Sequence, residues 1–284
     1  MSDDLGDRMK SFEMIEAGRI LIPQLPIMIR CDGRAFHSFC KGLKKPFDER
    51  LTDLMIATTK FLIEETGATI GYCQSDEISL CIWNDNYETE VIFNGRIQKL
   101  SSIIASLATY YFNRELPNYI PEKAPKSAFF DGKAWTVPSV GKMALFDCRV
   151  WNVPNLDEAT NCFLWRELDA TKNAISMVAQ SQFSHKELQG KHGNEMQEML
   201  FQQRGINFND FHSKFKRGSF IKKVTKVSKF TFDEITNLPL NHDARRNPDL
   251  TFKRNVIERV ELPQLSKIVN RVKVLFENET PIQQ

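Results

Sequence analysis

Two short acidic segments of the 284-residue sequence are suited to metal-dependent chemistry. Asp32 opens an Asp-Gly-Arg segment at the end of an apolar run, and Asp76 is the middle residue of a Ser-Asp-Glu segment between two apolar runs. If neighbouring strands bring Asp32 and Asp76 together, their carboxylates supply hard oxygen ligands for two magnesium ions, with Glu77 in a supporting role. Such a metal pair activates an attacking oxygen and neutralises phosphate charge. The alternative is that both aspartates are ordinary turn residues.

Several nearby positions are suited to binding phosphate groups. The backbone N–H groups of residues 33–36 could wrap a triphosphate just beyond Asp32. Lys45 adds a point charge, although a lysine in a polar loop is more often solvated. Arg96 and Lys99 lie at the start of a predicted helix, where cations are mildly unfavourable unless an anion binds there. The alternative for this pair is a solvated helix face.

A basic segment with interleaved aromatic residues suggests contact with a nucleic-acid backbone. The alternative is an edge strand that lysines protect from pairing with other chains. The cations are Lys214, Lys216, Arg217, Lys222, Lys223, Lys226 and Lys229, and the aromatic residues are Phe215, Phe220 and Phe230. Their number favours RNA as the partner.

The pattern of apolar residues predicts the elements that position these side chains. Strands are predicted at 25–32, 68–74, 77–83 and 143–150, and the second and third form a hairpin with Asp76 at its tip. Helices are predicted at 3–16, with Leu5 and Phe12 on its apolar face, at 49–66 after an Asp48 cap, and at 95–115. This order predicts an α+β fold, an antiparallel sheet with helices on one face.

The second half of the chain predicts further helices and strands. Helical patterns cover 155–181 and 193–204, residues 215–232 are predicted to form a basic hairpin, and a strand pair is expected within 251–275. We therefore divide the chain into a catalytic core at 1–150 and a region at 151–284 that completes the active site and contacts RNA. The two regions are expected to form one structural unit.

Composition restricts the class of protein. The formal net charge is only +2, so any nucleic-acid site must be a local patch. The six cysteines form no CxxC pair, which favours reduced thiols over disulfides or zinc. The polar start of the chain and the lack of a long apolar run predict neither a signal peptide nor a membrane span, so we expect a cytoplasmic protein.

Motifs spread over most of the chain resemble the tRNA-His guanylyltransferase family and its bacterial and archaeal relatives, the 3′-to-5′ polymerases. The combination of DGR and QSDE at this separation is quite specific. The matching segments are IRCDGRAFHSF (29–39), KPFDER (45–50), YCQSDEISL (72–80), GRIQKLSSIIAS (95–106), FDCR (146–149), WRELDATKNAI (165–175), FSHKELQGKHGNEMQEML (183–200), INFND (206–210) and FKRG (215–218).

This resemblance implies a palm fold, like that of polymerases and nucleotide cyclases, and a set of site residues. The two magnesium ions would be held by Asp32, the Gly33 carbonyl and Asp76. Nucleotide or phosphate contacts would come from Gly33, Arg34, Ala35, Phe36, Lys45, Asp48 and Ser75, and from Arg96 and Lys99 for the triphosphate that activates the RNA 5′ end. Expected substrates are ATP, GTP and tRNA, and the family is typically a homotetramer.

One segment departs from the family pattern. Eukaryotic members carry a His-Ile-Asn-Asn-Leu-Tyr-Asn run where this chain has Thr-Lys-Asn-Ala-Ile-Ser-Met (171–177), so only Asn173 matches plainly. Because that run is associated with untemplated G addition to tRNA-His, templated repair of tRNA 5′ ends fits better. The residues considered for RNA contact are Asp169, Asn173, Lys191, Asn194, Lys216 and Arg217. Two other hypotheses are a cyclase-like signalling enzyme and an RNA-binding protein with a vestigial palm.

Overall fold

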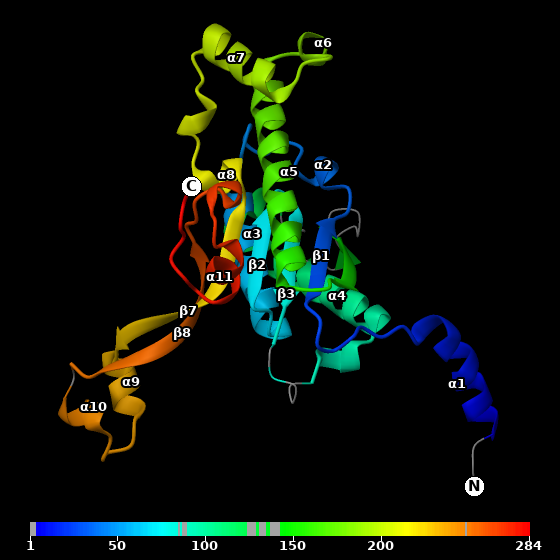
Figure 1. Ribbon diagram of the computed structural model, residues 1–284, viewed down its shortest axis with the longest axis vertical. Coiled ribbons are helices and arrows are strands. Elements are labelled where there is room, and N and C mark those ends of the chain that lie inside the picture. The colour runs from blue at the N-terminus through cyan, green and yellow to red at the C-terminus, as the bar shows by residue number, and fades with distance from the viewer. Residues whose placement is uncertain are drawn as a thin grey trace.

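A six-stranded antiparallel sheet forms the centre of the computed structural model (Figure 1), which describes residues 4–84, 86, 90–123, 129–130, 135–136, 143–247 and 249–284. The strand order is β6-β1-β3-β2-β7-β8. The strands are β1 (Ile27–Gly33), β2 (Ile70–Gln74), β3 (Glu77–Ile82), β6 (Phe146–Asn152), β7 (Ser219–Lys229) and β8 (Thr251–Val260). A separate two-stranded ladder joins β4 (Phe129–Phe130) to β5 (Trp135–Thr136).

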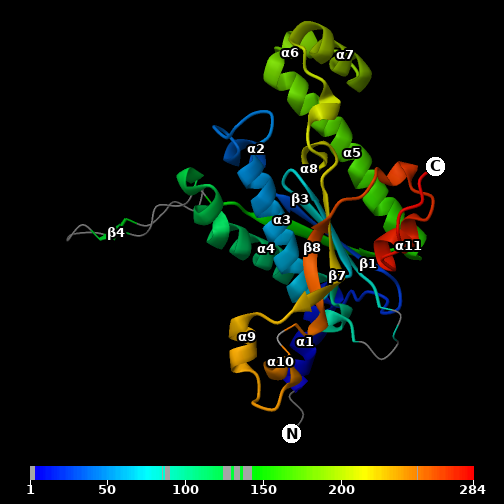
Figure 2. The ribbon, with the colours of Figure 1, turned by 90° about the vertical axis from the view of Figure 1, so that its left-hand side faces the viewer.

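Two helices cover one face of the sheet, as predicted for the palm. They are α3 (Glu49–Thr66) and α4 (Ile97–Tyr119), and Figure 2 shows both on the same side of the strands. The Asp48 side chain caps α3 by accepting a hydrogen bond from the Arg50 amide, and Gly67 ends the helix in the left-handed conformation at φ 69°. Leucine and isoleucine side chains of these helices pack against Ile29 and Leu80 in the main core.

The opposite face is covered by the long helix α5 (Leu156–Gln182), whose place in the fold was not predicted from the sequence. Its Phe163 packs with Met28 of β1 and Phe220 of β7 in a second core, together with α11 (Arg271–Phe276). Because β7 and β8 belong to the same sheet as β1, β2, β3 and β6, strands from beyond residue 150 complete the central sheet.

The predicted basic hairpin at 215–232 is wrong. These residues form the end of the short helix α8 (Ser213–Lys216) and then the single strand β7, whose partners are β2 and β8. The segment contains no Gly, Pro, Asn or Asp between Ser219 and Lys229, so the chain continues as one strand. The predicted strand pair at 251–275 is also wrong, since only β8 is a strand, followed by a short 3-10 helix, η5 (Leu265–Lys267), and by α11.

Smaller elements extend from this body. The helices α6 (His185–Leu188) and α7 (Gly193–Arg204) lie beyond the far end of α5, while α9 (Phe232–Asn237) and α10 (Asp243–Arg246) connect β7 to β8 at the tip of an arm (Figure 1). The helix α1 (Asp4–Ala17) projects away from the sheet, and its Leu5 and Phe12 are exposed. The remaining short helices are α2 (Phe36–Phe39), η1 (Ile92–Gly95), η2 (Pro121–Lys123) and η4 (Phe208–Asp210).

Two further sequence expectations concern thiols and membranes. All six cysteines are free thiols in the structure. Across the described parts of the chain, no helix combines the length and the apolar character that crossing a bilayer requires.

Lys222 is a buried cation without an acidic partner in the described structure. Its ammonium group donates to the Val274 carbonyl of α11, and burial lowers the pKa of Lys222 to about 8. Below pH 8 both folded and unfolded chains carry this proton, and the folded state bears the full unfavourable free energy of burying the charge. Between about pH 8 and 10.5 the folded side chain is neutral while the unfolded one is still charged, so this penalty declines as pH rises.

We therefore expect Lys222→Met to raise the free energy of unfolding at pH 7 by about 1–2 kcal/mol, since the loss of the bond to Val274 offsets part of the gain. The advantage over wild type shrinks as pH rises from 8 towards 10. Urea unfolding at pH 7 and pH 9.5 measures both effects. Lys223→Met, at the exposed neighbouring position, should give no such pH-dependent gain.

Candidate active site

The two aspartates predicted to hold metal meet at one end of the sheet. Asp32 lies near the end of β1, and its Cα is in register with that of Glu77 at the start of β3. Ser75 and Asp76 form the turn between β2 and β3, and the Gly33 N–H donates to the Asp76 carbonyl at 3.1 Å. The antiparallel register of β1 and β3 thus brings Asp32 beside Asp76 and Glu77, although the segments are more than forty residues apart.

The electrostatics of this end favour a bound cation. Burial raises the pKa of Asp76, and the charge of Asp32 raises it further. Burial also raises the pKa of Glu77, which the Arg166 guanidinium opposes. Neither Asp32 nor Asp76 forms an ion pair with a described side chain. Two adjacent carboxylates without a basic partner create a negative potential that a divalent cation neutralises.

The donor set fits magnesium. No group of three or more His, Cys, Asp or Glu side chains with metal-binding geometry occurs among the described residues. Magnesium nevertheless needs only one or two carboxylates, because waters and substrate phosphates complete its coordination. Asp32, Asp76 and the backbone at Gly33 are therefore a sufficient protein contribution. A Cβ at Gly33 would lie 2.3 Å from the Phe36 ring, so a larger residue there would displace the strand end.

The backbone of residues 33–36 is less available to phosphate than predicted. The Gly33 N–H donates to Asp76, and the Arg34 N–H donates to the Leu145 carbonyl at 2.8 Å. The chain then turns through Ala35, which has φ 54°, into the short helix α2. Only the amides of Ala35 and Phe36 thus remain for a ligand, because strand pairing continues through the first two positions.

A cleft of ≈ 660 Å³ opens beside Asp76. Its walls come from the loop that follows β1 and from the second half of α5, including Met177 and Gln180. Lys45 lines this cleft, as expected for a phosphate-binding residue. Other polar residues of this cleft were not predicted: His37, and Lys41 and Lys44, whose basic Lys-Gly-Leu-Lys-Lys run (41–45) was a usable signal.

Asp48 has a structural position in the loop beside the cleft. Its carboxylate accepts hydrogen bonds from the Lys44 and Arg50 amides, at 3.2 and 3.1 Å, and from the Arg50 guanidinium at 3.0 and 2.8 Å. The bond from Arg50 is the main reason that the pKa of Asp48 is lowered. The Asp48 carboxylate therefore holds the loop that carries Lys44 and Lys45 in place. Because an ionised carboxylate only accepts hydrogen bonds, it cannot donate one to a triphosphate.

Ser75 holds a left-handed backbone at φ 50°, which costs an L-residue about 1–2 kcal/mol. Its side chain also hydrogen-bonds Asp76 and partly opposes the burial that raises the pKa of Asp76. We expect Ser75→Gly and Ser75→Ala to lower nucleotide addition similarly, by about tenfold, since both lose the hydroxyl. Only the glycine variant should keep or gain stability, by up to about 1 kcal/mol over the alanine variant. Activity assays of both variants measure the effect of losing the hydroxyl group. Thermal unfolding measures the effect of the left-handed backbone at position 75.

A buried network connects the acidic end of the sheet to α5. The Arg166 guanidinium donates to the Glu77 carboxylate at 2.6 Å and to the Asp169 carboxylate at 3.0 Å. The Asn173 side chain also donates to Asp169, at 3.4 Å. Asp169 and Asn173 therefore interact with each other at the surface of α5, as their one-turn spacing predicts, and Arg166 joins them to the active site. The sequence analysis missed Arg166 because Glu77 is 89 residues away.

Arg96 and Lys99 do not meet the aspartates within one chain. Arg96 forms an isolated antiparallel bridge with Ile20. Two residues further on, the Ile22 amide donates to the Asn152 side chain. Asn152 is in register with Ile27, at the start of β1. Asp32 lies five residues further along this strand, about 17 Å from Ile27. Within one chain, Arg96 and Lys99 therefore lie near the other end of β1 from Asp32, and their contact with the activating triphosphate stays a prediction.

Most members of the predicted stripe of cations and aromatic rings contact other residues of the fold. Phe215 stacks on Phe47, Phe220 is buried, and Phe230 stacks on Phe252. Most of the cations have partners within the fold. The pairs are Lys214 with Glu49 and Asp53, Lys216 with the Asn209 carbonyl, Arg217 with Glu167, Lys222 with the Val274 carbonyl, Lys226 with Glu258, and Lys229 with Asp249.

The other two residues considered for RNA contact lie near α7. Lys191 precedes this helix and pairs with Glu195 at 3.4 Å, and Asn194 is exposed in its first turn. Both are far from the acidic end of β1, beyond the end of α5 (Figure 1).

Comparisons with known proteins agree with this architecture. The family model described as tRNAHis guanylyltransferase matches residues 6–154. A tRNA(His) guanylyltransferase of Candida glabrata is 33% identical over 76% of this chain and 90% of its own length, and that of Saccharomyces cerevisiae is 29% identical over 75% and 88%.

Solved structures extend the similarity to nearly the whole chain. A bacterial tRNA(His) guanylyltransferase-like protein in complex with ATP has a TM-score of 0.74 and 34% identity, covering 96% of this chain and 99% of its own. The corresponding GTP complex has a TM-score of 0.68 and 31% identity, covering 93% and 95%. The palm-type sheet, the paired aspartates and these matches together show that the chain is a nucleotidyltransferase of the tRNAHis guanylyltransferase family.

Proposed function

We propose that this chain adds nucleotides to tRNA 5′ ends in the 3′-to-5′ direction, with magnesium, as a templated repair enzyme. The observation that carries the proposal is the Asp32 and Asp76 pair beside a lysine-lined cleft. It is supported by similarity over 96% and 93% of the chain to bacterial guanylyltransferase-like proteins that bind ATP and GTP.

The site residues divide the work of phosphoryl transfer. Bound magnesium would supply charge neutralisation and activation of the attacking oxygen. Asp32 and Asp76 would hold the cations, and Lys41, Lys44 and Lys45, which line the cleft, would attract the phosphates of a bound triphosphate. Catalysis then depends on alignment and preorganised charge, because phosphoryl transfer needs little covalent help from the protein.

Untemplated G addition to tRNA-His is the second candidate. It is favoured by the names of the fungal relatives, which are tRNA(His) guanylyltransferases at about 30% identity. The segment 171–177 lacks the asparagine-rich run associated with that reaction. The bacterial ATP complex also covers more of this chain than the Saccharomyces cerevisiae guanylyltransferase structure, 96% against 80%. Templated repair is therefore the first choice.

We also propose that the protein works as a homotetramer. Arg96 and Lys99 are exposed, and Arg96 lies near the end of β1 opposite to Asp32 in their own chain. They can contact an activating triphosphate only if a second subunit brings them to the site. Size-exclusion chromatography with light scattering tests this point, and a monomer that is fully active would remove Arg96 and Lys99 from the mechanism.

The function is tested with 5′-monophosphorylated tRNA-His transcripts that are either intact or lack the first nucleotide. Purified protein is incubated with magnesium, ATP and labelled nucleotides. Restoration of the missing nucleotide, dictated by the opposing base, supports templated repair, and extension of the intact transcript by G supports the second candidate. Incorporation into neither RNA, with a cyclic nucleotide as product, would overturn both.

A further inference from the structure

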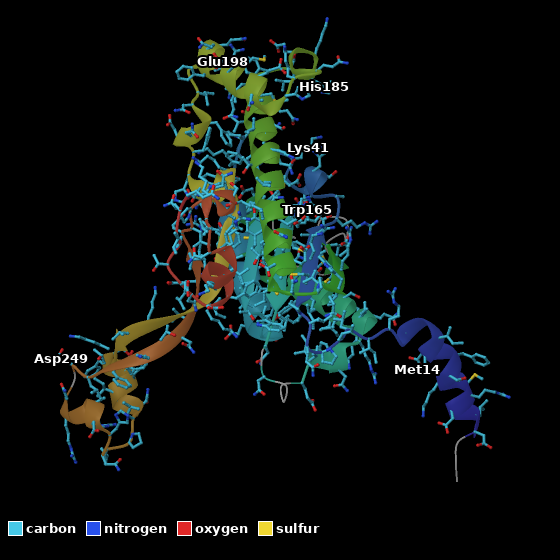
Figure 3. All side chains as sticks on the ribbon, viewed as in Figure 1. Met14, Lys41, Trp165, His185, Glu198 and Asp249 are labelled. Atoms are coloured by element: carbon cyan, nitrogen blue, oxygen red, sulfur yellow. The ribbon has the colours of Figure 1, made fainter. Side chains whose placement is uncertain are left out.

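Trp165 is an exposed aromatic residue beside the active site. It lies on α5 and exposes 52% of its surface, although tryptophan is usually largely buried. Two residues before it on the same helix, Phe163 is fully buried in the second core, so α5 itself is well packed at this level. Figure 3 labels Trp165 on the stretch of α5 that passes over the sheet. The exposed indole therefore belongs to a rigid part of the molecule.

Two arginines hold this ring. The guanidinium carbon of Arg166 lies 4.5 Å from the ring centroid, and that of Arg30 lies 5.5 Å from it. Arg166 is fixed by its bonds to Glu77 and Asp169, so its plane cannot move freely. Cation–π contacts of this kind restrain the indole while about half of its surface stays open.

Trp165 and its two arginines lie close to the predicted metal ligand Asp32. Arg30 and Asp32 are two residues apart on β1, so their side chains leave the same face of the sheet about 7 Å apart. Arg149 of β6 is in register with Arg30, and its side chain is 58% exposed, with Asp147 at 4.0 Å. The face next to Trp165 thus combines an open aromatic ring with cations that suit a phosphate backbone.

We propose that Trp165, held by Arg30 and Arg166, stacks on a nucleobase of the RNA substrate next to the nucleotide that reacts at Asp32 and Asp76. This inference rests on the proposed function. An RNA base is a better occupant than the base of the triphosphate, because Trp165 does not line the lysine-lined cleft beside Asp76. Stacking on an aromatic ring accepts any base, which a templated repair enzyme requires.

The test measures binding of a 5′-monophosphorylated acceptor-stem hairpin to the full chain without nucleotides, by tryptophan fluorescence and by anisotropy of a labelled RNA. We expect the hairpin to quench wild-type fluorescence and Trp165→Ala to bind it about 5- to 100-fold more weakly. Trp165→Phe should retain intermediate affinity without the quench. In nucleotide addition, the KM for RNA should rise in the alanine variant while kcat at saturating RNA stays within about threefold.

Phe232→Ala is the matched control, since Phe232 is 82% exposed on the arm and distant from α5. It should leave RNA affinity unchanged. Unchanged RNA affinity in Trp165→Ala, or an equal loss in Phe232→Ala, would overturn the stacking proposal alone. A hairpin that binds and quenches but is never extended would instead overturn the proposed function. A wild-type protein that does not bind the hairpin would overturn both.

Discussion

Replacing Asp76 with asparagine is expected to reduce nucleotide addition by about 10²–10³-fold or more while the protein remains folded. The amide keeps the size of the side chain but removes one of the two carboxylates that can hold magnesium. Burial and the neighbouring charge of Asp32 already disfavour the ionised form of Asp76, as its raised pKa indicates. Asparagine relieves this unfavourable interaction, so the melting temperature should be equal to or higher than that of wild type.

Asp147→Asn is the control for this experiment. Asp147 is in register with Asp32 on the other side of β1, but its side chain is 57% exposed and its nearest cation is Arg149 at 4.0 Å. Its removal therefore changes the local charge equally without changing the Asp32 and Asp76 pair, and activity should stay within about threefold of wild type. Equal losses in both variants would mean that general negative charge, and not a specific ligand pair, supports the reaction.

The parts of the fold that the sequence predicted are those fixed by local rules. The bounds of α3 follow from the Asp48 cap and the left-handed Gly67, and the structure places the helix at Glu49–Thr66. The meeting of Asp32 and Asp76 was predictable because one ends a strand and the other lies in the next hairpin turn. Each of these inferences needs only neighbouring residues and the alternation of apolar side chains.

The errors arose where distant residues decide the structure. The lysines of β7 suggested a free basic surface, but Lys226 meets Glu258 only because β8 pairs along the whole strand. The sequence could not show which end of β1 lies near Arg96, because the path of α4 across the sheet decides this. Arg166 was missed for a similar reason. Its partner Glu77 comes from a different layer of the molecule.

Arg217 is the case in which the sequence and the structure lead to opposite expectations. As an RNA contact, it should be dispensable for folding. In the structure its guanidinium donates to the Glu167 carboxylate at 3.2 Å and to the Leu262 carbonyl at 3.2 Å. The Glu167 side chain is only 2% exposed, and burial raises its pKa. Arg217 therefore compensates a carboxylate that water does not reach.

We expect Arg217→Met to lower the free energy of unfolding by about 3–5 kcal/mol, because it leaves Glu167 buried with one hydrogen bond, from the Leu265 amide. Chemical denaturation measures this loss. The double variant Glu167→Gln with Arg217→Met should recover much of it, since no buried charge remains. If the single variant keeps wild-type stability and instead binds tRNA more weakly, Arg217 contacts RNA as the sequence suggested. The sign of the coupling between the two substitutions thus decides whether this arginine serves the fold or the substrate.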